Sequence, residues 1–308
     1  MSLTHTAGRV ALSGLLGLSA LALMTPVAAQ QDFSQIEIKT EKLSDNVYML
    51  IGAGGNIGLS IGSDAVFVID DQFAPMAPKI KAAIARLTPK PVQFLLNTHF
   101  HFDHTGGNQA FGGEGALIVA HDNVRRRMSS EQLINFVGNA TKQAPAPRVA
   151  LPVVTVAGEI SFHINGDEVH AFHVPRAHTD GDLIVHFRNA DIVHMGDVFF
   201  NASYPFIDAG SGGSAEGVIA AFDRVLAIAG DKTKIIPGHG PLAGKADLLA
   251  ARAMMAVVTQ RIKDMRQAGK SEAEIRAARP AAEFDARYGG SFIKPEQFVL
   301  MMLGLVAK

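Results

Sequence analysis

One segment, Asn97–Gly107, constrains this chain more than any other. It carries His99, His101, Asp103 and His104 within six residues. Imidazole nitrogen and carboxylate oxygen are ligand types that suit zinc. A single tetrahedral ion could hardly use four ligands from so short a stretch. The economical interpretation is two neighbouring metal ions, each completed from elsewhere, so the fold must bring distant parts of the chain to this segment.

The composition limits what those other ligands are. The 308 residues contain no cysteine, which excludes disulfides and thiolate ligands and leaves His, Asp and Glu. Hydrophobic residues make up 48% of the chain and charged residues 19%, as in globular proteins. The formal net charge of -1 gives no electrostatic reason to expect a nucleic-acid partner.

The N-terminus has the layout of a secretory signal peptide. Arg9 precedes an apolar run over residues 10–24, and the small residues Val27, Ala28 and Ala29 follow. An uncleaved membrane anchor is the alternative, but the run is short for a span and ends at a proline. We therefore predict a signal peptide over residues 1–29, cleavage near Ala29, and a periplasmic or secreted domain over residues 30–308 with no stable membrane association.

The first half reads as strands that alternate with helices. Continuous apolar runs at Ala65–Ile69 and Val92–Leu96 predict strands buried on both faces, with a helix between them. Gly52–Gly58 resembles a nucleotide-binding loop, but a strand and not a helix follows it, so we interpret it as a hairpin tip. Asn97–Gly107 comes directly after a buried strand, where scaffolds of this kind carry ligands.

Two segments near the middle are less regular. Ser130 can cap a helix that runs through Glu131, Leu133 and Ile134. The Pro-rich and polar stretch Asn139–Pro152 is interpreted as the connection between two halves of one domain.

The second half begins with strands and ends with helices. Helices are expected after Ser214, along residues 248–265 and at Phe298–Val306. The class is therefore α/β, with sheets packed between helices. The expected strands are Val153–Val156, Glu159–Ile164, Glu168–Val174, Leu183–Phe187, Asp191–Met195 and Lys234–Ile236.

Three polar residues in strand-end loops are candidates for the missing ligands. His178 lies in a polar loop between two strands, Asp197 follows the strand Asp191–Met195, and His239 lies in a Gly-flanked turn after a buried strand. All three could meet the first segment at one edge of a sheet. The remaining histidines are better explained as hydrogen-bonded or surface residues.

These motifs together carry a family resemblance. HFHFDH at residues 99–104 and TGGN directly after it are followed by AHTDGD at 177–182, GD at 196–197 and PGHG at 237–240. In this order they resemble the metallo-β-lactamase superfamily over nearly all of residues 35–245. The resemblance implies an αββα sandwich of two similar halves with a dinuclear metal site, two Zn²⁺, at one edge; iron and manganese stay open.

The resemblance also implies a role for each residue. His99, His101 and His178 would hold one metal, and Asp103, His104 and His239 the other. Asp197 would bridge both, as in glyoxalase II-like members. A metal-bridging hydroxide would attack a carbonyl carbon, and Asp103 would orient it as the catalytic carboxylate.

Further residues are candidates for supporting roles around the metals. The resemblance implies that Asp70, at the end of an early strand, supports the metal ligands. Thr98, Asn97 and Thr179 are candidates for fixing the orientation of the imidazoles; as the alternative, they are ordinary loop residues. Phe200, Tyr204 and Phe206 could form an apolar wall for the substrate; as the alternative, they are ordinary core aromatics.

The expected function is that of an exported dizinc hydrolase that opens cyclic amides, including β-lactams, in a small-molecule carbonyl substrate. A lactonase or thioesterase is the second hypothesis, because Asp197 stands where the main β-lactamase group has a cysteine. A non-catalytic metal-binding protein on the same scaffold is the third. The sequence leaves the native substrate and the oligomeric state open.

Overall fold

The computed structural model describes residues 1–2, 32–136 and 138–306. The predicted signal peptide lies outside the described residues, apart from its first two, so its cleavage and the export of the protein stay predictions. The chain divides into two units, Met1–Asp32 and Phe33–Lys308, and every helix and strand of the described residues belongs to the second. None of the described helices is both long enough and apolar enough to span a bilayer.

The first sheet contains seven strands. The four strands β1–β4 pair antiparallel, and β5, β6 and β9 then add in parallel. In spatial order they are β1 (Lys39–Lys42), β2 (Val47–Ile51), β3 (Ile57–Ile61), β4 (Val66–Ile69), β5 (Phe94–Leu96), β6 (Leu117–His121) and β9 (Val154–Val156).

The second sheet repeats the plan of the first. Four antiparallel strands lead to β14, which pairs parallel to β13 after a helical crossover. This crossover contains α5 (Ala215–Ile228), just as α1 (Ala77–Ala85) connects β4 to β5. The strand order is β10 (Glu159–Ile164), β11 (Asp167–His173), β12 (Leu183–Phe187), β13 (Ile192–His194), β14 (Lys234–Ile236) and β15 (Ala243–Gly244).

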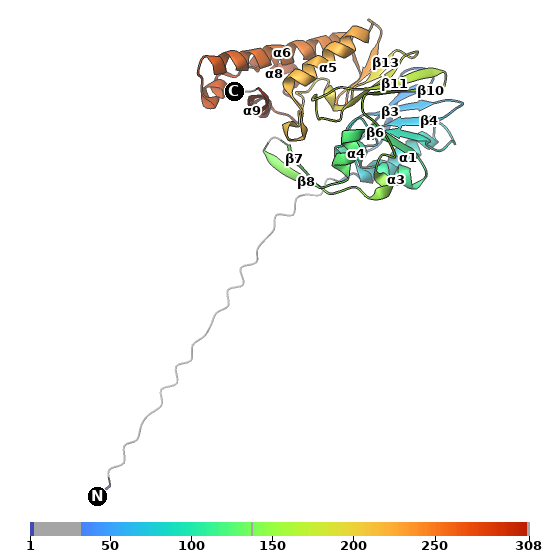
Figure 1. Ribbon diagram of the computed structural model, residues 1–308, viewed down its shortest axis with the longest axis horizontal. Helices are drawn as coiled ribbons and strands as arrows, with labels where there is room; N and C mark the ends of the chain where they lie inside the picture. The colour runs from blue at the N-terminus through green and yellow to red at the C-terminus, as the bar shows by residue number, and fades with distance from the viewer. Residues whose placement is uncertain (3–31, 137, 307–308) are drawn as a thin grey trace. The chain divides into compact units, whose positions relative to one another are not determined.

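Helices cover the outer face of each sheet. Figure 1 shows α5 and α6 along one side of the strands and α1 and α3 on the other. The longer helices besides α1 and α5 are α3 (Asn108–Gly113), α4 (Asp122–Met128), α6 (Lys245–Gln267), α7 (Glu272–Ala278) and α9 (Pro295–Leu305). Single turns of helix occur at α2 (Phe102–Thr105), α8 (Asp285–Tyr288), η1 (Ala74–Met76), η2 (Arg148–Ala150), η3 (Gly196–Val198), η4 (Ala209–Ser211) and η5 (Ala282–Phe284).

The alternation of side chains along the strands explains the layers. In β4, Phe67 and Ile69 pack against strands of the second sheet, whereas Val66 and Val68 pack against α1. A strand with apolar residues on both faces is stable only when both faces are covered. The result is the predicted αββα sandwich, which is therefore confirmed.

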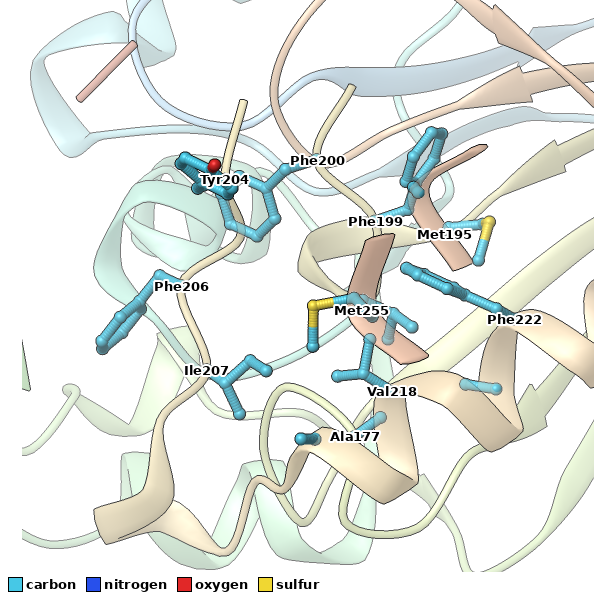
Figure 2. Close-up of a cluster of buried hydrophobic side chains, with 14 of the residues drawn as sticks. Ala177, Met195, Phe199, Phe200, Tyr204, Phe206, Ile207, Val218, Phe222 and Met255 are labelled. Atoms are coloured by element: carbon cyan, nitrogen blue, oxygen red, sulfur yellow. The ribbon is translucent and has the colours of Figure 1, made fainter. Parts of the chain in front are cut away.

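The outer layer of the second half is the largest part of the core. Figure 2 shows Phe222 of α5 facing Met195 and Phe199, and the two phenylalanine rings lie 5.9 Å apart. Met255 of α6 belongs to the same buried cluster. Burying each such side chain contributes about 1.5–3 kcal/mol, so this layer holds the second sheet and its loops rigidly.

The prediction of a helix after Ser130 is wrong. The segment forms a hairpin of β7 (Gln132–Phe136) and β8 (Asn139–Gln143). Leu133 and Asn135 are exposed while Ile134 is buried, which is the period of a strand. The turn is possible because Gly138 has φ 91° and donates its N–H to Asn135 Oδ1 at 3.0 Å.

The predicted connection between the halves, Asn139–Pro152, is also placed differently. Strand β8 occupies its first part, and β9 pairs parallel to β6 in the first sheet. Val153–Val156, expected in the second half, thus closes the first. The short connection from β9 to β10 passes from one sheet to the other, so the polar composition of residues 139–152 reflects exposed hairpin and loop.

Candidate metal centre

The seven predicted ligands come from four separate segments that meet at one edge of the sandwich. His99 and His101 follow β5, and Asp103 and His104 lie in α2. His178 lies in the β11–β12 loop, Asp197 in η3 after β13, and His239 after β14. Their ligand atoms form two sets, within each of which all lie within 4.8 Å of one another: His99, His101, His178 and Asp197, and Asp103, His104 and His239.

The first set has the spacing of a coordination shell. His101 Nδ1 lies 3.1 Å from His99 Nε2 and 3.0 Å from His178 Nε2. Nitrogens bonded at 2.0–2.1 Å to one tetrahedral ion lie about 3.3 Å apart. The three imidazoles therefore converge at a separation that suits a shared cation.

The second set is similar but more open. His104 Nε2 lies 3.4 Å from His239 Nε2, and Asp103 Oδ2 lies 3.3 Å from His239 Nε2. The side chains of Asp103 and His239 are each 20% exposed, whereas those of His99, His104 and His178 are 1% or less. A substrate would therefore approach from the side of Asp103 and His239.

Asp197 lies between the two sets and turns one oxygen to each. Its Oδ1 lies 3.0 Å from His104 Nε2 and 3.3 Å from His239 Nε2. Its Oδ2 lies 3.7 Å from His178 Nε2 and 3.9 Å from His99 Nε2. Oδ1 is buried, and its contacts with the His104 and His239 imidazoles do not have the geometry of hydrogen bonds. A cation in each set would satisfy both oxygens, so the donor set fits two metal ions.

A buried carboxylate orients His104. Asp70 Oδ2 lies 2.8 Å from His104 Nδ1. Asp70 also accepts hydrogen bonds from the Thr98 backbone N–H at 2.8 Å and from its hydroxyl at 2.7 Å. Thr98 Oγ1 lies 3.0 Å from His99 Nδ1. These contacts leave Nε2 of both imidazoles directed to the centre.

Two contacts from a single loop orient the other imidazoles. Asp208 Oδ2 lies 3.1 Å from His101 Nε2, and the Phe206 carbonyl lies 2.8 Å from His178 Nδ1. Asp208 is 2% exposed. Burial alone would raise its pKa, but the contacts with His101 and Ser211 lower that pKa to about 2. Asp208 is thus an ionised partner of His101.

The charges of the centre favour a cation. Burial opposes ionisation of Asp197, but His104 and His239 outweigh it and hold the Asp197 pKa well below its usual value. Burial likewise opposes protonation of His178 and lowers its pKa to about 4. For His239, burial also opposes protonation, but Asp197 and Asp103 outweigh it and raise its pKa to about 9. Metal binding at the second set would therefore release a proton from His239, because only a neutral imidazole can be a ligand.

Two glycines allow the backbone to approach the ligands closely. A Cβ at Gly55, in the β2–β3 loop, would lie 2.1 Å from the His104 ring, and one at Gly238 would lie 2.0 Å from Asp197 Oδ1. The Asn56 side chain ties the same loop to the carbonyls of Pro237 and Gly240 at 2.9 Å each. The glycine-rich segment is thus the hairpin tip that the sequence predicted, and it lies against the centre.

Two predicted supporting residues do not contact an imidazole. Thr179 donates its N–H and hydroxyl to Asp182 at 2.8 and 2.5 Å, which closes the loop that carries His178. Asn97 pairs with Asn108 at 3.0 and 2.8 Å. Both residues shape the loops, which favours the alternative interpretation that they are ordinary loop residues.

The predicted aromatic wall changes in composition. Tyr204 is fully buried, stacks on Phe298 at 4.1 Å and donates its hydroxyl to Asp285 at 2.8 Å, so it faces the helical core and not a substrate. Phe200 is 3% exposed and stacks on the His239 ring at 5.2 Å, which supports that ligand from behind. Figure 2 shows Phe206 on the same stretch of chain.

Sequence reasoning missed Asp208, Asn56 and the contact of Gly55 with His104. For Asp208 the only signal is an acidic residue directly after the apolar stretch Tyr204–Ile207. Its partner His101 is 107 positions away in the chain, so no local pattern connects the two.

Comparison with known proteins agrees with this architecture. A family model described as "Metallo-beta-lactamase superfamily" matches residues 52–239, which include all seven residues of the centre. A metallo-beta-lactamase from Pontibacter korlensis has a similar structure, with a TM-score of 0.59 and 16% identity over 71% of this chain and 99% of that one.

Curated relatives match this chain over part of their length. A hydroxyacylglutathione hydrolase from Polaromonas sp. is 28% identical over 60% of this chain and 65% of its own length. A 2,4-dinitroanisole O-demethylase subunit alpha from Nocardioides sp. is 27% identical over 51% of this chain and 43% of its own length. The chain therefore spans less than two thirds of either relative.

Proposed function

The chain belongs to the metallo-beta-lactamase superfamily, and we propose that it is a hydrolase that uses two metal ions, most simply zinc, to cleave a small carbonyl substrate. The position of Asp197 carries this proposal. Each of its oxygens faces a different ligand set, so one carboxylate can serve two ions held close together.

The chain's own residues then have distinct tasks. When bound, two such cations supply a nucleophilic water at neutral pH and a Lewis acid for the carbonyl oxygen. Asp103, at the exposed side, accepts a hydrogen bond from the attacking water and orients it. Burial opposes ionisation of Asp103, but His104 and His239 outweigh it and lower its pKa, which keeps it an acceptor. The buried imidazoles stay fixed through Asp70, Thr98 and Asp208.

Two kinds of carbonyl bond are candidates, each favoured by a different observation. The fold is that of metallo-beta-lactamases, which supports the opening of cyclic amides, including β-lactams. The carboxylate at Asp197, shared between two sets, and the similarity to a hydroxyacylglutathione hydrolase support cleavage of a thioester or lactone. The two reactions share the attack on a carbonyl carbon and differ in the leaving atom. It is nitrogen in a cyclic amide, sulfur in a thioester and oxygen in a lactone.

A substrate panel on the purified, metal-loaded protein tests both. It contains a penicillin, a cephalosporin, a carbapenem, a γ-lactone and a simple thioester. His99→Ala and Asp103→Asn should each lose hydrolysis of whichever substrate is turned over, because the first removes a ligand and the second the orienting charge. Unchanged hydrolysis in either variant would refute the mechanism, and no turnover of any β-lactam would remove the cyclic-amide candidate.

We also propose that the protein acts after export. The support is the N-terminal layout of Arg9, an apolar run and the small residues before Gln30. Expression of the full chain in a Gram-negative host, with fractionation and N-terminal sequencing, tests this. A periplasmic product that begins near Gln30 is expected, and a cytoplasmic product that keeps residues 1–29 would contradict it.

A further inference from the structure

Three phenylalanines from separate segments form a continuous aromatic rim beside the candidate metal centre. Phe136 comes from the β7–β8 hairpin, Phe206 from the loop before η4, and Phe292 from the loop between α8 and α9. The Phe136 ring lies 4.9 Å from the Phe206 ring and 6.1 Å from the Phe292 ring. We call these three residues the aromatic rim.

The aromatic rim reaches the predicted ligands at both ends. The Phe206 ring lies 5.7 Å from the His178 ring and 6.1 Å from the His101 ring. The Phe292 ring lies 5.6 Å from the ring of His239, one of the two exposed members of the centre. The rim therefore lies along both ligand sets, and its Phe292 end is on the side from which a substrate would approach.

Phe292 is unusual for a side chain of its size. It is 43% exposed, whereas Phe206 is 6% exposed. A large apolar side chain left in water beside a centre with polar ligands keeps surface available that a bound molecule could cover.

The hairpin that carries Phe136 is fastened to the centre. The Gln143 side chain of β8 donates to the carbonyl of Phe100 at 2.9 Å, directly before His101 in the chain. Ile134 of β7 is 4% exposed and belongs to the core of the second half. Figure 1 shows the hairpin standing out from the strands on the side of the C-terminal helices, consistent with the contact of Phe136 with Phe292. Phe136 is thus held in place.

Cationic side chains of the described residues, the lysines and arginines, form no hydrogen bond or ion pair with the seven side chains of the centre. Arg127 stacks on the Phe100 ring at 5.4 Å, but its guanidinium is bonded to Asp180 at 2.8 Å. A carboxylate on the substrate would therefore lack a cationic side chain among these contacts.

We propose that the aromatic rim binds the acyl part of the substrate and that this protein prefers carbonyl substrates whose acyl group is apolar, uncharged and large enough to contact a ring. This inference rests on the proposed hydrolase function and adds a substrate class to it. The rim uses aromatic contact and burial of apolar area, which together distinguish a phenyl group from a carboxylate of similar length.

Matched thioesters test the preference. The phenylacetyl and succinyl thioesters of N-acetylcysteamine share a leaving group, and release of the thiol measures kcat/KM for each. The phenylacetyl compound should be preferred by at least about tenfold, the factor expected from covering one partly exposed aromatic ring. Phe292→Ala should remove most of that preference by lowering kcat/KM for the phenylacetyl compound alone.

One further variant controls for general damage, and another tests the aromatic rim a second time. Leu133→Ala lies on the same hairpin, but Leu133 is 62% exposed and faces away from Ile134 and Phe136, so the preference should not change. Phe136→Ala should act as Phe292→Ala does. An equal or greater rate with the succinyl compound, or a preference that survives both rim variants, would overturn the proposal.

Binding separates this inference from the proposed function. If neither thioester is hydrolysed, the thioesterase candidate fails, but the rim is still testable by calorimetry with phenylmethanethiol and mercaptoacetate on the metal-loaded protein. Tighter binding of phenylmethanethiol that Phe292→Ala reduces supports the rim without any turnover. Equal binding of the two thiols, or an unchanged difference in Phe292→Ala, overturns it.

Discussion

Replacement of Asp208 by asparagine should weaken one metal site and spare the other. Asp208 Oδ2 lies 3.1 Å from His101 Nε2, while Oδ1 accepts the Ser211 N–H at 3.1 Å. An asparagine can keep only one of these contacts, because its second atom is a donor. If the amide keeps the Ser211 contact, its NH₂ group faces His101 Nε2 and favours the tautomer that carries its proton on Nδ1. That proton would occupy the atom directed at His99 and His178.

The expected loss of metal affinity follows from the role of contacts that orient a metal ligand without binding the metal. Loss of one typically costs 10–100-fold in metal affinity, or about 1.4–2.8 kcal/mol. Because Asp208 contacts His101 and no ligand of the second set, one of two ions should leave at a lower chelator concentration than in the wild type. Titration with a competing chelator, followed by elemental analysis, measures both ions.

A matched control is available. Asp285→Asn removes the charge of an aspartate that forms hydrogen bonds with Tyr204 and Arg279. Asp285 contacts none of the seven predicted metal ligands, so the metal affinity of both sites should stay as in the wild type. Wild-type affinity at both sites in Asp208→Asn, or equal weakening at both, would contradict the reasoning.

Three other changes probe the same centre. Asp197→Ala should lower the metal content from two ions per chain towards one. Activity should fall by more than the roughly 10–100-fold expected when a contact that only orients a ligand is lost. Two ions at full occupancy by elemental analysis would contradict a shared carboxylate. Gly55→Ala should destabilise the fold by about 1–3 kcal/mol and reduce activity, because the new Cβ would lie 2.1 Å from the His104 ring; Gly113→Ala, with nothing within 4 Å, is the control in thermal melts. Removal of metal should lower Tm by roughly 6 °C, since about 4 kcal/mol of binding energy at a thousandfold excess over Kd acts on a chain of 308 residues. An unchanged Tm would mean that the seven residues do not bind metal in the folded state.

The sequence was a good guide wherever structure is decided by neighbours in the chain. The buried strand Val66–Ile69 follows from a continuous apolar run, and Ser214 caps α5 as its position suggests. The hairpin at Gln132–Gln143 was missed because an exposed two-stranded element has little apolar signal, and Ser130 before a mixed segment reads equally well as a helix start. Assignment of β9 to the wrong half has the same origin, since three residues cannot reveal their partner strand.

The sequence by itself determined which side chains can form the centre. Metal ligands must be His, Asp or Glu in a chain without cysteine, and they must follow strands to reach one edge of the sheets. Only the tertiary structure decided how they meet. The division of the two Asp197 oxygens between the sets, the contact of Asp208 with His101 and the aromatic rim all join segments far apart in the chain. Such contacts depend on the packing of whole elements against one another, and packing leaves no periodic or spaced pattern in the local sequence.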